Sequence, residues 1–238
     1  MATGVLYMIP VEISSGPSGR VLPQSVKEVV EPLLYFAVEN VRSARRFIKR
    51  LLPQKNIDEL TFFNIGKHSP FKEDGNYSPI MAPLLRGESV GVLSEAGCPG
   101  IADPGAVVAS FAQKKGIRVV PLVGPSSILL SLMASGLNGQ SFAFKGYLPK
   151  EAGELRRQVQ TMEQAVRCEG QTQIFIETPF RTEKLFADLL RLCHSDTLLC
   201  VAQDITGDQE LIVTRSIAYF RQHPPKWNRV PTIFLLGR

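Results

Sequence analysis

The sequence predicts an α/β protein of two α/β domains, with a mainly parallel sheet in the N-terminal domain and a mixed sheet in the C-terminal one. Apolar segments of strand character alternate with helical segments along most of the 238 residues, and this alternation is typical of parallel sheets covered by helices. Two short loops of small residues each link an apolar strand to a helix. Near the C-terminus, Gly207-Asp208 separates two apolar segments as a hairpin turn does, which predicts a mixed second sheet.

The N-terminal half holds apolar segments of strand length between segments with helical spacing. Strands are predicted at Val5–Pro10, Leu34–Val38, Glu59–Asn64, Ser89–Leu93 and Ile117–Val123, and helices at Gln24–Glu31, Arg42–Leu52, Pro79–Arg86 and Pro104–Lys115. The last helix has the clearest boundaries. Asp103 suits its N-cap, Pro104 its first position and Gly116 its end.

The C-terminal half continues the alternation and ends with the hairpin and a closing strand. Helices are predicted at Ser126–Gly136, at Lys150–Glu169, from Thr178-Pro179 to Cys193 and at Ser216–Gln222, and strands at Ser141–Gly146, Thr172–Glu177, Thr197–Ile205, Glu210–Thr214 and Val230–Leu236. A boundary near residues 118–124 gives domains 1–120 and 121–238. We expect a ligand cleft between the two domains, because the loop Gly124–Ser127 lies at this boundary.

Composition excludes several classes of protein. The hydrophobic fraction of 44% and the charged fraction of 21% are typical of a soluble globular protein. No apolar run is long enough to cross a bilayer, and the first residues, MATGVLYMIPVEI, lack the features of a secretory signal. The four cysteines show no CxxC spacing and only three histidines are present, so neither a disulfide framework nor a metal site is indicated. We therefore expect a cytoplasmic protein that uses no membrane and no metal.

A basic stripe lies on the helix predicted at Arg42–Leu52. The chain has a net charge of +5, and five of its cations recur at helical spacing: Arg42, Arg45, Arg46, Lys49 and Arg50. Five cations on one helix face are suited to the phosphates of a nucleic acid. An ordinary solvated helix face has the same pattern, and the sequence leaves both interpretations open.

The run GVLSEAGCPGIADPG, residues 91–105, predicts a ligand-binding loop. It joins an apolar strand to a helix, and such junctions lie at the carboxyl edge of the sheet, where α/β proteins bind ligands. Gly97 and Gly100 allow close approach of the backbone because they carry no Cβ atom. The run contains neither a Walker motif nor GxGxxG. Together with the second small-residue loop, Gly124–Ser127, it predicts one ligand held largely by main chain.

Four blocks then identify a family. They read, in chain order, SEAGCPGIADPG, IRVVPLVGPSSILLSLMASGL, FAFKGYLP and IFIETPFR. In these blocks the chain resembles the tetrapyrrole methylase superfamily, the class III S-adenosylmethionine-dependent methyltransferases. It most resembles the branch that methylates a cytidine ribose 2′-hydroxyl in small-subunit ribosomal RNA. The resemblance implies S-adenosylmethionine as methyl donor, bound between two α/β domains of a homodimer, and ribosomal RNA or the small ribosomal subunit as partner.

The resemblance also implies a donor site. By position it falls on Pro10, Glu95, Ala96, Gly97, Cys98, Ser126 and Ser127, with Glu177 and Asp204 lining the same cleft. Two segments depart from the branch's pattern. VEISSGPSGR follows Pro10 in place of a Thr-Pro-Ile-Gly-Asn run, and Gln203–Gly207 replaces a basic-acidic-Leu-Thr-Lys block. These departures leave two alternatives: a methyltransferase of the same fold for a small molecule such as a tetrapyrrole, and a binding protein that keeps the donor pocket without turnover.

The chemistry of methyl transfer indicates few catalytic groups. Transfer from a sulfonium is a direct displacement, so the protein mainly aligns the reacting atoms. A ribose hydroxyl is a poor nucleophile and benefits from a proton acceptor, for which Glu39, Glu177 and Glu12 are candidates. Each of these carboxylates also has a structural interpretation.

Several remaining candidate residues also have two possible roles. Arg42, Arg45, Arg46 and Arg181 are candidates for binding the substrate, and an ion pair with a nearby carboxylate is the alternative for Arg181. Glu95 can accept hydrogen bonds from the donor or from the N–H groups of its own loop. Cys98 has no histidine partner in its motif, so we interpret it as lining a cavity rather than as a nucleophile.

Overall fold

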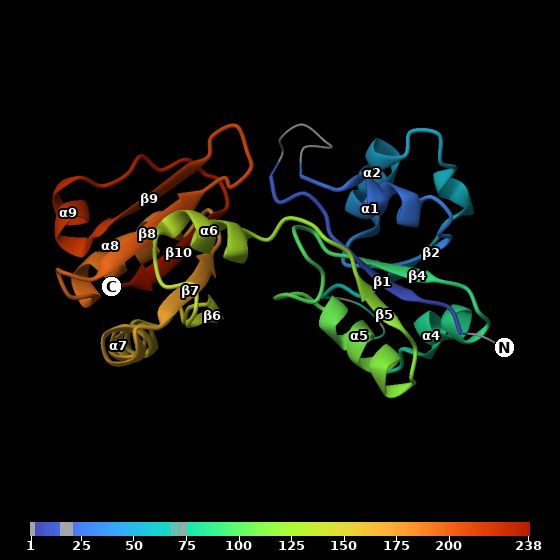
Figure 1. Cartoon of the computed structure of the whole chain (residues 1–238), viewed down its shortest axis with the longest axis horizontal. Coiled ribbons are helices and arrows are strands. Elements are labelled where there is room, and N and C mark those ends of the chain that lie inside the picture. The colour runs from blue at the N-terminus through green and yellow to red at the C-terminus, as the bar shows by residue number, and fades with distance from the viewer. Residues whose placement is uncertain (1–2, 15–20, 68, 70, 72–74) are drawn as a thin grey trace. The chain divides into compact units, whose positions relative to one another are not determined.

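The computed structural model describes residues 3–14, 21–67, 69, 71 and 75–238 (Figure 1). The chain forms two compact units, Met1–Ser126 and Ser127–Arg238. Each contains one five-stranded sheet with helices, so the predicted class of two α/β domains is confirmed. The units divide after the loop that follows strand β5, whereas the sequence places the boundary after residue 120, inside that strand. Of the unusual segment after Pro10, residues 15–20 lie outside the described residues.

The first unit is a parallel α/β sheet. Its elements are β1 (Leu6–Ile9), α1 (Gln24–Val30), β2 (Tyr35–Val38), α2 (Val41–Leu51), the 3-10 helix η1 (Ile57–Glu59), β3 (Thr61–Asn64), α4 (Ser78–Leu85), β4 (Val90–Leu93), α5 (Gly105–Lys114) and β5 (Val119–Pro121). The strand order is β3-β2-β4-β1-β5, and every neighbouring pair is parallel. All five strands therefore end at the same edge of the sheet.

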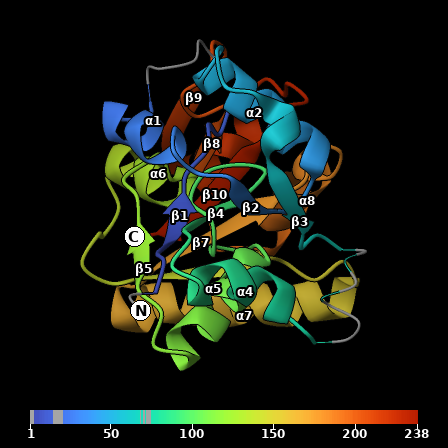
Figure 2. The same cartoon turned by 90° about the vertical axis from the view of Figure 1, so that its right-hand side faces the viewer.

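Two apolar layers cover this sheet. Figure 2 shows α1 and α2 on one side of it and α4 and α5 on the other. Successive strand residues face opposite layers: Phe36 and Val38 pack with α1 and α2, while Ala37 between them packs with α4 and α5. Gly91 leaves room in the first layer, because a Cβ atom there would lie 2.5 Å from Ile9 Cδ1. Close packing on both faces fixes the strand ends that carry the candidate site.

The second unit is a mixed sheet. Its elements are α6 (Ser127–Ser135), β6 (Phe142–Tyr147), α7 (Ala152–Glu169), β7 (Thr172–Glu177), α8 (Thr182–Leu192), β8 (Leu198–Gln203), β9 (Leu211–Ser216), α9 (Ile217–Gln222) and β10 (Thr232–Gly237). The strand order is β6-β7-β10-β8-β9; β6 pairs parallel with β7, and the other three pairs are antiparallel. The predicted hairpin around Gly207-Asp208 is the antiparallel pair β8 and β9.

Helices cover both faces of the second sheet. The buried side chains of α7, α8 and α9 form one core with alternate residues of β7, β8 and β10, among them Phe175, Val201 and Phe234. Helix α6 packs against β9 and β10, and Thr214 of β9 donates a hydrogen bond to its Ser135 carbonyl at 2.8 Å. Among the described residues, no helix is both long and apolar enough to span a bilayer.

Candidate functional site

Three loops meet at the carboxyl edge of the first sheet. Val11, just after β1, exchanges two backbone hydrogen bonds with Gly97 in the loop after β4, at 2.9 and 3.2 Å. The loop after β5 lies against β1 as well, since a Cβ atom at Gly124 would lie 2.2 Å from Pro10 Cβ. Because β4, β1 and β5 are parallel neighbours, the structure brings the predicted residues of these loops together.

Gly97 combines an unusual backbone conformation with close neighbours. Its φ is 72°, a left-handed conformation that side chains rarely adopt. A Cβ atom there would lie 3.1 Å from Ile13 Cγ2 and 3.3 Å from the Pro125 carbonyl oxygen. The preceding residues Glu95 and Ala96 are exposed. The loop thus presents two accessible residues beside a backbone segment that tolerates no side chain.

Cys98 faces inward from the same loop. Its thiol donates to the Pro125 carbonyl at 3.4 Å, and burial raises the pKa of the thiol. A raised pKa keeps the sulfur protonated at neutral pH, which makes it a poor nucleophile. These observations argue against Cys98 as a nucleophile, and its position lining a cavity stays a prediction.

Asp103 closes the end of the loop. Its Oδ1 accepts hydrogen bonds from the N–H groups of Gly100 at 2.8 Å and Gly105 at 2.6 Å. Helix α5 begins at Gly105 with Pro104 at its N-cap, so the predicted N-cap at Asp103 and first position at Pro104 are each one residue early. Asp103 still supports the helix start, because it accepts the hydrogen bond from the first helical N–H. Burial raises the pKa of Asp103, and the two backbone hydrogen bonds oppose this rise.

Glu39 lies beside this loop at the end of β2. Its Oε1 accepts a hydrogen bond from the Glu95 N–H at 3.3 Å. Burial raises the pKa of Glu39, the Glu95 N–H lowers it, and the carboxylates of Asp103 and Glu95 raise it further. Three carboxylates from two loops therefore gather here, and Glu39 is the one whose ionisation is opposed by both burial and its neighbours.

Glu95 is anchored from helix α2 instead of by its own loop. Asn40 caps α2 by accepting hydrogen bonds from the N–H groups of Arg42 and Ser43. The Ser43 hydroxyl then donates to Glu95 Oε1 at 2.5 Å. Sequence reasoning missed Ser43, since no local pattern links it to a residue 52 positions away. This bond replaces the loop N–H contacts that were the alternative role for Glu95.

The basic stripe on α2 is divided between paired and free cations. Arg45 forms an ion pair with Asp58 at 2.6 Å, Arg50 forms one with Glu12, and Lys49 donates to the Lys55 carbonyl. Arg42 and Arg46 are exposed, and within the described part of the chain neither forms an ion pair. Of the cations predicted to meet phosphate, these two remain available.

The other predicted residues belong to the second unit. Glu177 ends β7, and Gln203, just before Asp204, ends β8; both strands pair with Thr232 of β10, so the two ends share an edge. Arg181 forms an ion pair with Glu177 at 3.2 Å, so the alternative interpretation of Arg181, an ion pair with a nearby carboxylate, is present in the structure. The Asp204 carboxylate accepts from the Gln209 N–H at 3.0 Å within a tight turn.

The two serines after Pro125 lie where the units divide. Ser126 is the last residue of the first unit, and Ser127 is the first residue of both the second unit and helix α6. Both serines are half-buried.

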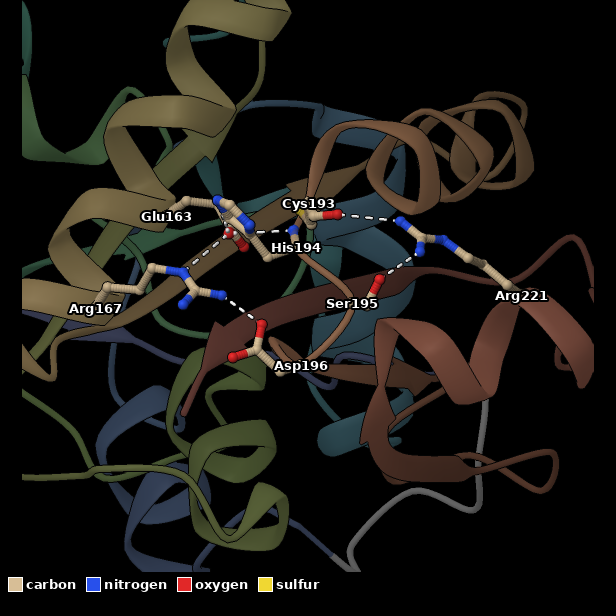
Figure 3. Close-up of polar contacts among 7 residues, drawn as sticks. All are labelled: Glu163, Arg167, Cys193, His194, Ser195, Asp196 and Arg221. Atoms are coloured by element: carbon tan, nitrogen blue, oxygen red, sulfur yellow. Dashed lines mark hydrogen bonds and ion pairs between the residues drawn. The ribbon is translucent and has the colours of Figure 1, made fainter.

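A polar cluster at the opposite edge of the second sheet was not predicted (Figure 3). Glu163 of α7 accepts from the His194 N–H at 3.2 Å, and Arg167 bridges Glu163 and Asp196. Arg221 of α9 bonds the same loop, which precedes β8. The cluster ties this loop to two helices, and within the described residues no group of side chains is suited to hold a metal ion.

Comparisons with known proteins give consistent names. No protein-family model matches the chain. It is 30% identical over 218 residues to ribosomal RNA small subunit methyltransferase I of Pseudomonas aeruginosa, covering 92% of this chain and 72% of that protein. The protein of the same name in Synechocystis is 27% identical over 227 residues, with 94% and 76% covered.

Solved structures share the fold at low sequence identity. A diphthine synthase matches with a TM-score of 0.68 at 10% identity, covering 98% of this chain and 90% of that one. The methyltransferase CobJ matches with a TM-score of 0.63 at 16% identity, covering 100% and 95%. A uroporphyrin-III C-methyl transferase from Thermus thermophilus, solved in complex with S-adenyl homocysteine, has a TM-score of 0.56 at 16% identity, with 99% and 97% covered. These likenesses show the fold.

Proposed function

The chain belongs to the ribosomal RNA small subunit methyltransferase I family, and we propose that it transfers a methyl group from S-adenosylmethionine to a ribose 2′-hydroxyl of small-subunit ribosomal RNA. Family membership confirms the resemblance that the four sequence blocks indicated, and the protein is a methyltransferase. The observation in the structure that most supports the proposal is the loop after β4, built around Gly97 at the carboxyl edge of the first sheet.

This loop is proposed to bind the methyl donor. Gly97 adopts a positive φ and packs closely against Ile13 and the Pro125 carbonyl, which holds the exposed residues Glu95 and Ala96 in place. Within the described residues, Glu95 Oε2 forms no hydrogen bond, and it can accept one from a hydroxyl or amino group. When bound, S-adenosylmethionine supplies an electrophilic methyl group on sulfur. The residues proposed to hold it are Pro10, Glu95, Ala96, Gly97, Cys98, Ser126 and Ser127, and the participation of Glu177 and Asp204 stays a prediction.

Glu39 is the better supported proton acceptor for the hydroxyl. An effective general base has a pKa close to the working pH, and burial raises the pKa of Glu39 in that direction. One weak hydrogen bond engages its carboxylate. Glu177 Oε1 accepts two hydrogen bonds from Thr178, and its buried Oε2 lies 3.2 Å from the Arg181 guanidinium, whose positive charge favours the ionised carboxylate and opposes its taking a proton. We therefore propose that Glu39 takes the proton of the attacking hydroxyl.

Helix α2 is proposed to face the RNA. Within the described part of the chain the exposed guanidinium groups of Arg42 and Arg46 form no ion pair, so both are available to RNA, and that of Arg42 is suited to a phosphate contact. Arg45 is already paired with Asp58, so its contribution is expected to be smaller. A homodimer, which the resemblance implies, is part of the proposal and is tested by sedimentation of the purified chain. A cytoplasmic location, expected from the composition, also remains part of the proposal.

Two titrations and one transfer assay test the proposed function. Calorimetry with S-adenosylmethionine and with its demethylated product is expected to give saturable binding. Small-subunit RNA lacking the native methyl group is then expected to accept label from the donor, at a position that becomes resistant to alkaline cleavage because its 2′-hydroxyl is blocked. Donor binding together with label transfer to a tetrapyrrole, and none to RNA, would contradict the RNA assignment.

A further inference from the structure

A small pocket lies beside the proposed donor loop, within the first unit. Its volume is about 180 Å³, and it is bounded by α2 and by the segments after β1 and β4. Four buried apolar side chains contribute to its lining: Val11, Ala44, Phe47 and Leu93. Pockets that enclose whole drug-sized ligands measure roughly 300–1,000 Å³. This pocket therefore suits a single ring system and not an entire cofactor.

Charged groups are arranged around this apolar lining. Arg46 and Arg50 both line the pocket, one helical turn apart on α2. Arg50 is held by an ion pair with Glu12, whose side chain is 9% exposed. Arg46 has no ion-pair partner among the residues that the structure describes. The Glu95 carboxylate, fixed by Ser43, completes the rim.

This combination favours a flat, neutral ring over a phosphate. Two carboxylates, Glu12 and Glu95, line the pocket and oppose a phosphate there. An apolar lining with guanidinium and carboxylate groups offers stacking, hydrogen-bond donors and acceptors at once. Sequence-specific RNA recognition uses the same elements, because unstacked bases stack on guanidinium planes and bond through their edges.

We propose that this pocket receives one unstacked nucleobase of the RNA substrate, and that Arg46 reads it. The proposal rests on the proposed function for the identity of the polymer. It assigns Arg46 a role distinct from Arg42: Arg46 contacts a base and contributes to sequence preference, whereas Arg42 lies outside the pocket and contacts phosphate. The adenine ring of the methyl donor could bind through the same contacts, so the test below distinguishes donor adenine from an RNA base as the occupant of the pocket.

The test compares Arg46→Ala with Lys49→Ala, because each substitution removes one positive charge from α2. Lys49 is exposed on the same helix and does not line the pocket, so Lys49→Ala is the control for Arg46→Ala. Affinities are measured for short single-stranded homopolymers of C, A and U and for an abasic ribose-phosphate chain of equal length. The quantity of interest is the ratio of the best base-bearing affinity to the abasic affinity. Ala44→Leu, which fills space without changing charge, is measured in parallel.

For the native chain we expect the ratio of base-bearing to abasic affinity to be well above one. Arg46→Ala and Ala44→Leu are expected to lower it about tenfold, while Lys49→Ala weakens binding to all chains equally and leaves the ratio intact. Equal weakening of all chains by Arg46→Ala would overturn the proposal, as would a native ratio of one. A preserved ratio with weaker S-adenosylmethionine binding in Arg46→Ala would overturn it in favour of the donor adenine.

The methyl-transfer assay tests the proposed function independently of the base pocket. Native protein that shows the base preference but transfers no methyl group to small-subunit RNA would contradict the proposed function and leave the base pocket supported. If the native protein transfers the methyl group but Arg46→Ala leaves the ratio of base-bearing to abasic affinity unchanged, only the proposed base pocket is contradicted. Circular dichroism of Ala44→Leu and of Arg46→Ala checks that both variants keep the native fold.

Discussion

Glu39 and Glu177 each end a buried strand, one in each unit, yet their surroundings differ. Among the described residues, the Glu39 carboxylate accepts one hydrogen bond, at 3.3 Å, and it lies near two further carboxylates. Glu177 has a fully buried side chain, but it accepts two bonds from Thr178 and pairs with Arg181. Position at the end of a strand therefore identifies a carboxylate as a candidate proton acceptor. Its hydrogen-bond and ion-pair partners decide whether it can react or only supports the fold.

The largest expected effect is on catalysis by Glu39. In Glu39→Gln, the amide oxygen can still accept from the Glu95 N–H, but the group cannot take a proton. We expect kcat to fall about 100-fold or more, with S-adenosylmethionine affinity retained in calorimetry. In the native enzyme kcat should rise with pH as Glu39 deprotonates, with a midpoint above the ordinary 4.5, and this limb should be absent from the variant.

Glu177→Gln sharpens the same comparison. If Glu177 were the proton acceptor, its variant would lose the pH-dependent limb while Glu39→Gln kept it. That pattern would reverse the roles assigned to the two carboxylates.

A second effect concerns the donor loop. In Gly97→Val, a β-branched side chain must adopt a φ of 72° against Ile13 and the Pro125 carbonyl. We expect S-adenosylmethionine affinity to fall more than tenfold, because such strain costs about 1–3 kcal/mol and displaces the loop. Gly116→Val is the matched control, since Gly116 has a φ of 68° with nothing within 4 Å of a Cβ atom. Undiminished donor affinity in folded Gly97→Val would count decisively against the site.

The sequence predicted the elements better than the contacts between them. The strand Thr172–Glu177 was placed with its observed bounds, and the basic helix was placed within one residue of α2, because apolar periodicity and caps are local. An ion pair of Arg181 with a nearby carboxylate was one of its two interpretations, and the structure identifies the partner as Glu177. The Ser43–Glu95 bond and the pairing of Arg45 with Asp58 depend on the packed fold, so no local pattern could reveal them.

A third, smaller effect tests the structural role of Glu177. In Glu177→Gln the Arg181 guanidinium loses its buried counter-charge. We expect the free energy of unfolding to fall by about 1–3 kcal/mol, measured by urea denaturation. Glu183→Gln is the control, because Glu183 is exposed in α8, the helix that follows Arg181, and its change should lie within about 0.5 kcal/mol. Equal effects of the two substitutions would mean that the buried pair contributes nothing specific.

The smallest effect is the pH dependence carried by Asp103, a carboxylate that resembles Glu39 in burial but supports a helix start. Its pKa in the folded state is raised above the ordinary 3.8, so the folded chain keeps a proton that the unfolded chain has released. Its contribution to stability is therefore complete below the unfolded pKa and is lost as pH rises through the folded one. Asp103→Asn keeps an oxygen for the Gly100 and Gly105 N–H groups but does not titrate. As pH rises from about 3 to 7, the unfolding free energy of the native chain should therefore fall relative to that of Asp103→Asn. A difference that stays constant over this range would show that burial does not perturb Asp103, and the same inference for Glu39 would lose its nearest support.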